Sequence, residues 1–155
     1  QTDPALIAKS LAEAKAVSVS ENREGAWVIG SDSVVSVDGQ LFSKPRSRDE
    51  AAEHLRFFSG KKMLLVSAAA LARDGTADWS LSGNAELEVR ELTEDFIQSY
   101  LDAEWPEVGN TVGVFRIEGP GVQLFDAISG GHFTILGMPL LPLLRQLRNR
   151  GLLPS

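Results

Sequence analysis

Apolar residues recur at helical spacing in four segments of the chain. The first follows Asp3-Pro4, which suits an N-cap and a first helical position. The second follows Ser47, which with Glu50 has the spacing of a capping box, and it ends near Gly60. The third and fourth begin near Thr93 and Pro139. The residues expected on the buried faces are Leu6, Ile7, Ala8, Leu11, Ala12, Ala16, Ala51, Ala52, Leu55, Phe58, Phe96, Ile97, Tyr100, Leu101, Leu140, Leu141, Leu144 and Leu147.

Short apolar runs between these segments predict strands. The strands are expected at residues 27–29, 34–37, 41–44, 63–72, 86–92, 113–117 and 122–128, and 104–110 is expected to be a loop. Asp38-Gly39 predicts a two-residue hairpin turn. Helices and strands alternate without strict βαβ repetition. This pattern predicts an α/β fold in one domain, with a mixed, twisted sheet flanked by helices.

Composition narrows the class of protein. The chain has 155 residues, enough for one domain with a single core, and it has no cysteine for disulfides or thiolate metal sites. A formal net charge of −6 argues against nonspecific binding to nucleic acid. No apolar run is long enough to predict a transmembrane helix, and no signal peptide is visible. We expect a cytoplasmic protein.

The strongest candidates for chemistry are Asp32 and Lys44. Asp32 follows the apolar run 27–29, and a carboxylate at the end of a strand can hold a divalent metal or orient water. Its alternative role is to cap the turn before Val34. Lys44 is followed by Pro45 and could pair with phosphate, although most lysines are simply solvated.

The motifs around these residues resemble the Maf-type nucleotide pyrophosphatases. The matching segments are 28–35, Asp38-Gly39, Lys44-Pro45, the preceding helix at 11–16, Phe58-Ser59-Gly60, 113–121 and 136–140. The order of these segments over nearly the whole chain carries the resemblance, because no single motif is specific. Family members also open with a strand and a Ser-x-Ser-x-Arg-Arg loop that grips phosphates, which this sequence lacks. We therefore expect residues 1–155 to be a Maf-like domain without its first strand and phosphate-gripping loop.

The resemblance implies a two-lobed fold like that of Maf and ITPase proteins, and an activity. The reaction would be hydrolysis of a nucleoside triphosphate between the α and β phosphates, giving a monophosphate and pyrophosphate. Asp32 would bind Mg²⁺, with Mn²⁺ as an alternative, or orient the attacking water. Lys15 and Lys44 would neutralise phosphate charge, and Ser33 would contact the substrate. A homodimer is implied as well.

Glu118 is the candidate reader of the base. The branch of the family with Glu here, followed by Gly-x-Gly and Leu-Phe, resembles 7-methyl-GTP pyrophosphatases, and the branch with Gln resembles enzymes for UTP and dTTP. A carboxylate accepts two hydrogen bonds from the N–H edge of guanine and would favour a cationic methylated base. Its alternative role is to cap the turn at Gly119.

Two other functions stay open from the sequence. The family has been linked to septum formation and cell-division arrest, so the chain could be a catalytically silent nucleotide-binding protein. The absence of a phosphate-gripping loop could also leave a folded domain without activity. His54 and His132 are isolated and give no metal or triad pattern.

Overall fold

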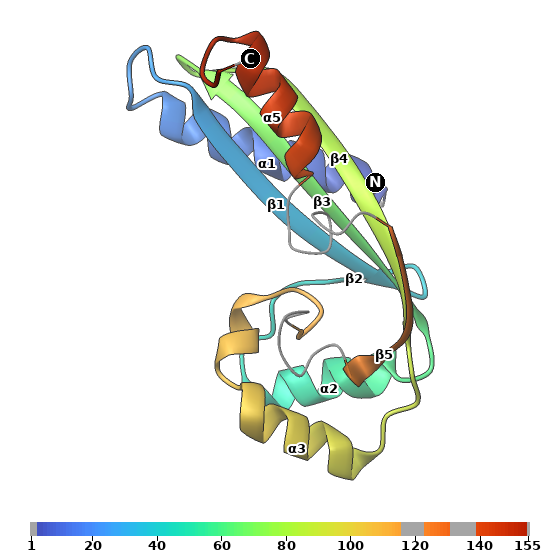
Figure 1. Ribbon diagram of the computed structural model, residues 1–155. Coiled ribbons are helices and arrows are strands. Elements are labelled where there is room, and N and C mark those ends of the chain that lie inside the picture. Colours follow the sequence, from blue (N-terminus) through green and yellow to red (C-terminus); the bar gives the residue numbers. More distant parts are fainter. Residues whose placement is uncertain (1–2, 116–122, 131–138, 155) are drawn as a thin grey trace. The chain divides into compact units, whose positions relative to one another are not determined.

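The computed structural model describes residues 3–115, 123–130 and 139–154, and its elements form an α/β fold (Figure 1). The helices are α1 (Pro4–Ser20), α2 (Arg48–Phe58), α3 (Glu94–Glu104), the 3₁₀ turn η1 (Glu107–Asn110) and α5 (Leu140–Asn149). The strands are β1 (Val28–Val37), β2 (Gln40–Phe42), β3 (Lys62–Arg73), β4 (Thr76–Val89) and β5 (Phe125–Gly130). The predicted α/β class is confirmed.

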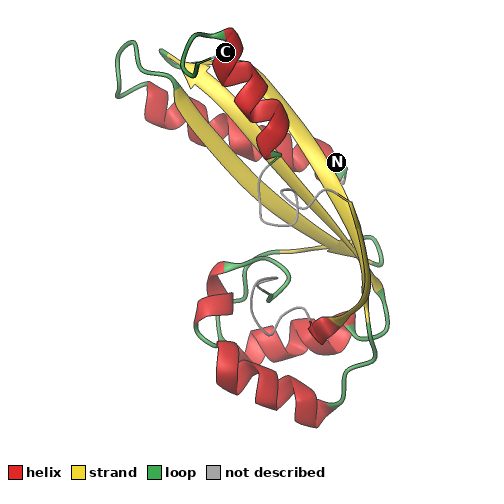
Figure 2. Cartoon of the chain, viewed as in Figure 1, coloured by secondary structure: helices red, strands yellow, loops and turns green. Residues whose placement is uncertain are grey.

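The strands form one sheet in the order β2-β1-β3-β4-β5 (Figure 2). β1 pairs antiparallel with β2, placing Val35 opposite Phe42, and β4 pairs antiparallel with β5, placing Leu87 opposite Ile128. β3 and β4 are neighbours joined at Asp74-Gly75, and such a short connection allows only antiparallel pairing. Figure 1 shows that β1 starts at the end of the sheet where β3 finishes, so these two strands run in opposite directions as well. The expectation of a mixed sheet was therefore wrong, because every connection between these strands returns the chain antiparallel.

The chain forms two compact units. Unit 1 comprises Gln1–Ser33, Val66–Asn84 and Gly131–Ser155, and unit 2 comprises Val34–Leu65 and Ala85–Gly130. β1, β3 and β4 each contribute residues to both units. Each unit is described by itself below.

Unit 1 has a helix on each face of its part of the sheet. α1 lies on one face and α5 on the other (Figure 1). The α1 side chains of Ala8, Ala12 and Ala16 are fully buried. On the face covered by α5, Leu143 packs with Ala69 and Leu71, and the partly buried side chains added to this cluster are Trp27, Trp79 and Leu147.

Unit 2 is built around α2 and α3. The cap of α2 is the predicted one, because Glu50 N–H donates to Ser47 Oγ at 3.1 Å. The Glu50 carboxylate reaches back to Arg46 N–H at 2.9 Å. Arg48 of α2 donates to the side chain and carbonyl oxygens of Gln98 on α3. The largest buried side chains of this unit are Phe58, Leu55, Met63, Leu87, Ile97, Leu101, Leu124, Val35 and Val37.

Several predicted elements differ from the structure. β1 is continuous through residues 30–33, which were expected to separate two strands. β4 begins at Thr76 instead of residue 86, because its first half pairs with β3 through the hairpin at Asp74-Gly75, and there Ala77, Trp79 and Leu81 alternate with polar residues. Residues 113–115 form a turn instead of a strand, and 104–110 contains the end of α3 and η1.

The buried faces of two helices were also partly wrong. On α1, Leu6 and Leu11 are exposed, and the sheet is contacted by the alanines. On α5, Leu141 is 64% exposed whereas Leu143 is 2% exposed. On α1 the leucine stripe is not the one that the sheet covers, whereas on α5 the covered stripe contains Leu143 and the predicted Leu147. The small alanines of α1 allow a closer approach to the strands than leucines would.

Candidate functional site

Asp32 lies in β1, on the face of the sheet that α1 covers. A Cβ added at Gly30 would stand 2.4 Å from the Ala12 carbonyl oxygen and 2.8 Å from the Ala16 amide nitrogen, so Gly30 faces α1 directly. Side chains two positions apart on a strand share a face, which places Asp32 on the same side. Because Gly30 has no side chain, the backbone of α1 can pack directly against β1, two residues before Asp32.

Lys15 of α1 reaches this carboxylate. Its Nζ is 2.5 Å from Asp32 Oδ1 and 3.4 Å from the Ser31 carbonyl oxygen. The Lys15 side chain is 57% exposed and that of Asp32 is 17% exposed. The sequence placed these two residues in one site, and the structure brings them together as an ion pair that solvent can reach from the lysine side.

Ser33 has a different neighbour. Its Oγ is 3.0 Å from the Oγ of Ser67 on β3, and Ser67 is fully buried. By strand alternation Ser33 lies on the face opposite Asp32. The hydroxyl predicted to contact substrate is therefore hydrogen-bonded to another side chain within the sheet. Sequence reasoning missed Ser67, although it is the one polar residue in the apolar run 63–72.

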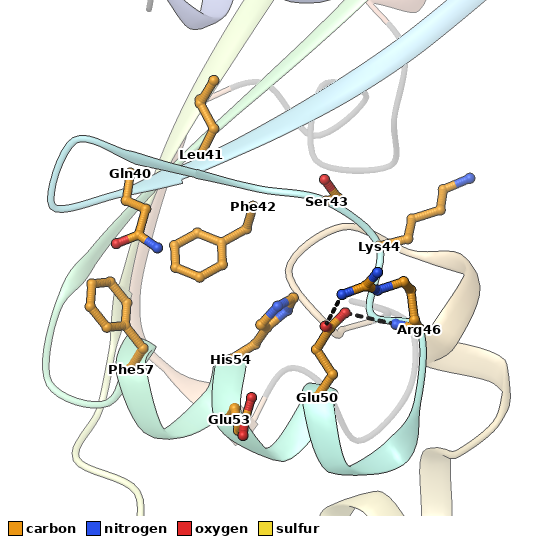
Figure 3. A pocket seen from close by; sticks show the side chains of 10 residues that line it. All are labelled: Gln40, Leu41, Phe42, Ser43, Lys44, Arg46, Glu50, Glu53, His54 and Phe57. Carbon is orange, nitrogen blue, oxygen red and sulfur yellow. Dashed lines mark hydrogen bonds and ion pairs between the residues drawn. The ribbon is translucent and has the colours of Figure 1, made fainter.

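Lys44 belongs to unit 2, at one end of a groove between β2 and α2 (Figure 3). The groove has a volume of about 600 Å³. Figure 3 shows the Lys44 ammonium directed away from the aromatic rings on the groove floor. The residues lining the groove are Gln40, Leu41, Phe42, Ser43, Lys44, Arg46, Glu50, Glu53, His54 and Phe57.

Two of the charged side chains that line the groove, Arg46 and Glu50, form an ion pair. Glu50 accepts from the Arg46 backbone N–H and from its guanidinium at 3.2 Å, and these contacts lower the pKa of Glu50. His54 packs edge-on against Phe42 with 5.1 Å between ring centroids. Burial lowers the pKa of His54, so the imidazole is neutral near pH 7. In the described part of the chain its Nδ1 is buried without a hydrogen-bond partner.

No ready-made metal cage is present in the described ranges. Among residues 3–115, 123–130 and 139–154, no group of three or more His, Asp or Glu side chains could hold a metal ion. Within the same ranges, no helix is long and apolar enough to cross a membrane. Any divalent ion at Asp32 would therefore need most of its ligands from water or from a bound anion.

Comparison with families of known proteins gives a match to the family described as Maf-like protein, over residues 1–150. The chain belongs to this family. The resemblance predicted from the ordered motifs is thereby confirmed.

Three relatives of this Maf-like chain carry two different names between them. A Sphingopyxis alaskensis protein named nucleoside triphosphate pyrophosphatase is 47% identical over 153 residues, which cover 98% of this chain and 77% of that protein. A Rhizobium etli protein named 7-methyl-GTP pyrophosphatase is 47% identical over 148 residues, covering 96% of this chain and 74% of that protein. A Brucella suis protein with the second name is 46% identical over 145 residues, covering 94% and 73%.

The predicted site residues of the Maf-like chain divide by location. Lys15, Asp32 and Ser33 lie in unit 1, where the first two form the ion pair and the third pairs with Ser67. Lys44 lies in unit 2. Glu118, the candidate base reader, and His132 lie outside the described residues.

Proposed function

We propose that this chain is a nucleoside triphosphate pyrophosphatase that cleaves between the α and β phosphates. The observation that carries the proposal is the Lys15–Asp32 pair, at 2.5 Å, in a chain 47% identical to relatives named for this activity. A cation and a carboxylate held on rigid elements are the parts that such a hydrolysis needs.

The residues present fit a magnesium ion, with manganese as an alternative. Mg²⁺ is commonly held by one or two carboxylates together with waters and substrate phosphates, and it does not need an all-protein cage. Asp32 offers one carboxylate, and 17% of its side chain is exposed. When bound, the ion would neutralise charge on the phosphate oxygens.

The chain's own groups would position and activate the reactants. Asp32 orients the attacking water, or holds the metal, from a strand that α1 fixes in place. Lys15 and Lys44 pair with phosphate oxygens as point charges on long stems. Water adds to the α phosphorus, its proton passes to a base or to solvent, and pyrophosphate leaves.

The finer proposal is that the preferred substrate is 7-methyl-GTP. Two supports exist: the names of the Rhizobium etli and Brucella suis relatives, and the carboxylate of Glu118. A carboxylate pairs with the two N–H groups on the guanine edge, whereas uracil and thymine offer one N–H between acceptors. The alternative is a UTP and dTTP pyrophosphatase.

Pyrophosphate release tests both levels of the proposal. The protein is assayed with Mg²⁺ against 7-methyl-GTP, GTP, UTP, dTTP and CTP. We expect the fastest release from 7-methyl-GTP. Asp32→Asn should lower the rate at least about 100-fold, the scale of a lost acid–base group, while the far-UV CD spectrum is unchanged. Asp126→Asn is the matched control, because Asp126 is an exposed aspartate on β5, and it should keep the wild-type rate.

Each other outcome has a defined meaning. A preference for UTP or dTTP would keep the enzyme and discard Glu118 as reader of a methylated base. A fully active Asp32→Asn protein would remove Asp32 from the chemistry. Nucleotide binding without pyrophosphate release would replace the enzyme with a nucleotide-binding protein.

A further inference from the structure

The Lys15–Asp32 contact has a consequence for any cation at this carboxylate. Lys15 Nζ stands 2.5 Å from Asp32 Oδ1 and also 3.4 Å from the Ser31 carbonyl oxygen. The ammonium therefore already contacts one carboxylate oxygen of Asp32 and one backbone carbonyl oxygen of β1. A metal at Asp32 would share its ligand with a positive charge only a few ångströms away.

The position of Lys15 is fixed by close packing of α1 against β1. Lys15 is flanked on α1 by Ala12 and Ala16, whose backbones approach Gly30 closely enough to exclude a Cβ. The stem of Lys15 thus starts from a helix locked against the strand that carries Asp32. The Lys15 side chain itself is 57% exposed, which leaves it room to turn away from Asp32.

We propose that Lys15 competes with the metal for Asp32, and that a triphosphate removes this competition by taking the ammonium. This inference rests on the function proposed above. A dication and an ammonium repel each other strongly when one carboxylate of low exposure must serve both. Phosphate oxygens offer the ammonium an equivalent anionic partner, which leaves Asp32 to the metal.

The competition couples the two ligands thermodynamically. If nucleotide draws Lys15 from Asp32, nucleotide raises the affinity for metal, and metal must raise the affinity for nucleotide by the same factor. Lys15 would then bias the site against a metal ion bound without substrate. In this role Lys15 controls when Asp32 is available to the metal ion, in addition to its proposed contact with phosphate.

Binding of Mn²⁺, followed by electron paramagnetic resonance without nucleotide, tests the competition directly. Lys15→Met keeps the length of the side chain and removes the charge, and it should bind Mn²⁺ about three-fold or more tightly than the wild type, the scale of a lost ion pair of moderate exposure. Lys15→Arg keeps a cation and should stay as weak as the wild type. Lys9→Met removes one charge from the same helix and controls for net charge.

A second arm adds saturating α,β-methylene-GTP, which cannot be cleaved at the α–β bridge. Mn²⁺ binding should tighten in both proteins, since the ion also contacts phosphates, but the gain should be larger in the wild type than in Lys15→Met. Equal or weaker Mn²⁺ binding by folded Lys15→Met in the first arm would overturn the proposal. So would an equal gain from Lys9→Met.

Failure of this inference can be told apart from failure of the proposed function. Tighter Mn²⁺ binding by Lys15→Met in a protein that releases no pyrophosphate keeps the competition and removes the enzyme. Pyrophosphate release together with unchanged Mn²⁺ binding in Lys15→Met keeps the enzyme and removes the competition. Asp32→Asn should weaken Mn²⁺ binding in either case, and wild-type Mn²⁺ affinity in that variant would also overturn the inference.

Discussion

At the scale of single residues, His54 is a half-buried group whose charge state affects stability. Its ring lies among Phe42 and Phe58, with centroids 5.1 and 6.0 Å away. Burial lowers its pKa, and the nearby carboxylates of Glu50 and Glu53 offset only part of that effect. The folded protein therefore favours the neutral imidazole, whereas the unfolded chain binds a proton near the usual pKa of 6.5.

We predict that His54 makes the protein less stable as the pH falls below 6.5. In that range the unfolded state binds more protons than the native state, so the free energy of unfolding falls with decreasing pH until the imidazole also titrates in the fold. Above the unfolded pKa, neither state is protonated and the effect disappears. Urea unfolding at about pH 7.5 and about pH 5.5 measures this loss of stability. Both pH values lie above the range in which most carboxylates titrate.

His54→Phe is the matched variant, because a phenyl ring fits the aromatic cluster and cannot be protonated. Its unfolding free energy at about pH 7.5 should be unchanged or higher by about 1 kcal/mol, since a buried nitrogen without a partner is removed. The loss of stability between the two pH values should be smaller than in the wild type. The same loss in both proteins would show that His54 is not the responsible group.

The proximity of Lys15 and Asp32 could be predicted at this scale, and their roles stay predictions. Asp32 was chosen from its place after an apolar run and Lys15 from the family resemblance; 17 positions separate them, and the fold joins them. The pairing of Ser33 with Ser67 could not be predicted in the same way. It depends on the register of two neighbouring strands, which a single sequence does not specify.

At the scale of elements, the contact of α1 with β1 determines where Lys15 stands. The three alanines of α1 that face the sheet are fully buried, and Gly30 leaves room for the helix backbone itself. Neither partner has a side chain that could retract to admit a larger group. The distance between helix and strand is thus set by backbone contact, which makes it sensitive to a single methyl group.

We predict that Gly30→Ala destabilises the protein by about 1–3 kcal/mol, the usual cost of overpacking a core. The added Cβ would stand 2.4 Å from Ala12 O and 2.8 Å from Ala16 N, and both are backbone atoms. The helix must move, so pyrophosphate release should fall together with the urea midpoint. Ser31→Ala is the control, since its side chain lies on the opposite face and the change adds no atoms. An equally stable and active Gly30→Ala protein would contradict the proposed packing.

The elements that were predicted correctly carry strong local signals, and those that were missed carry weaker ones. Ser47 caps α2 and Thr93 caps α3, and Asp38-Gly39 turns with φ of 53° and 74° as a two-residue hairpin requires. The first half of β4 has only a short alternation of Ala77, Trp79 and Leu81 with polar residues, and its strand form depends on pairing with β3. The buried stripe of α5 is set by its packing against Ala69 and Leu71 of β3. These contacts cannot be read from the sequence of the helix alone.

At the scale of the whole molecule, three long strands join the two units. β1, β3 and β4 pass from one unit into the other without a break, and they are neighbours in one sheet. If one of these strands loses its pairing within one unit, its residues in the other unit lose support as well. We therefore predict that the two compact units unfold together, in one cooperative transition.

The three tryptophans allow this prediction to be measured. Trp27 and Trp79 lie in unit 1, and Trp105 lies in unit 2. Trp105→Phe leaves only the unit 1 reporters, and the double variant Trp27→Phe with Trp79→Phe leaves only the unit 2 reporter. In each variant the urea midpoint from fluorescence should equal the midpoint from far-UV CD, because coincident probes are the mark of two-state unfolding. A fluorescence midpoint that departs from the CD midpoint in opposite directions in the two variants would show that the units unfold separately. In that case the continuity of β1, β3 and β4 would not be enough to couple them.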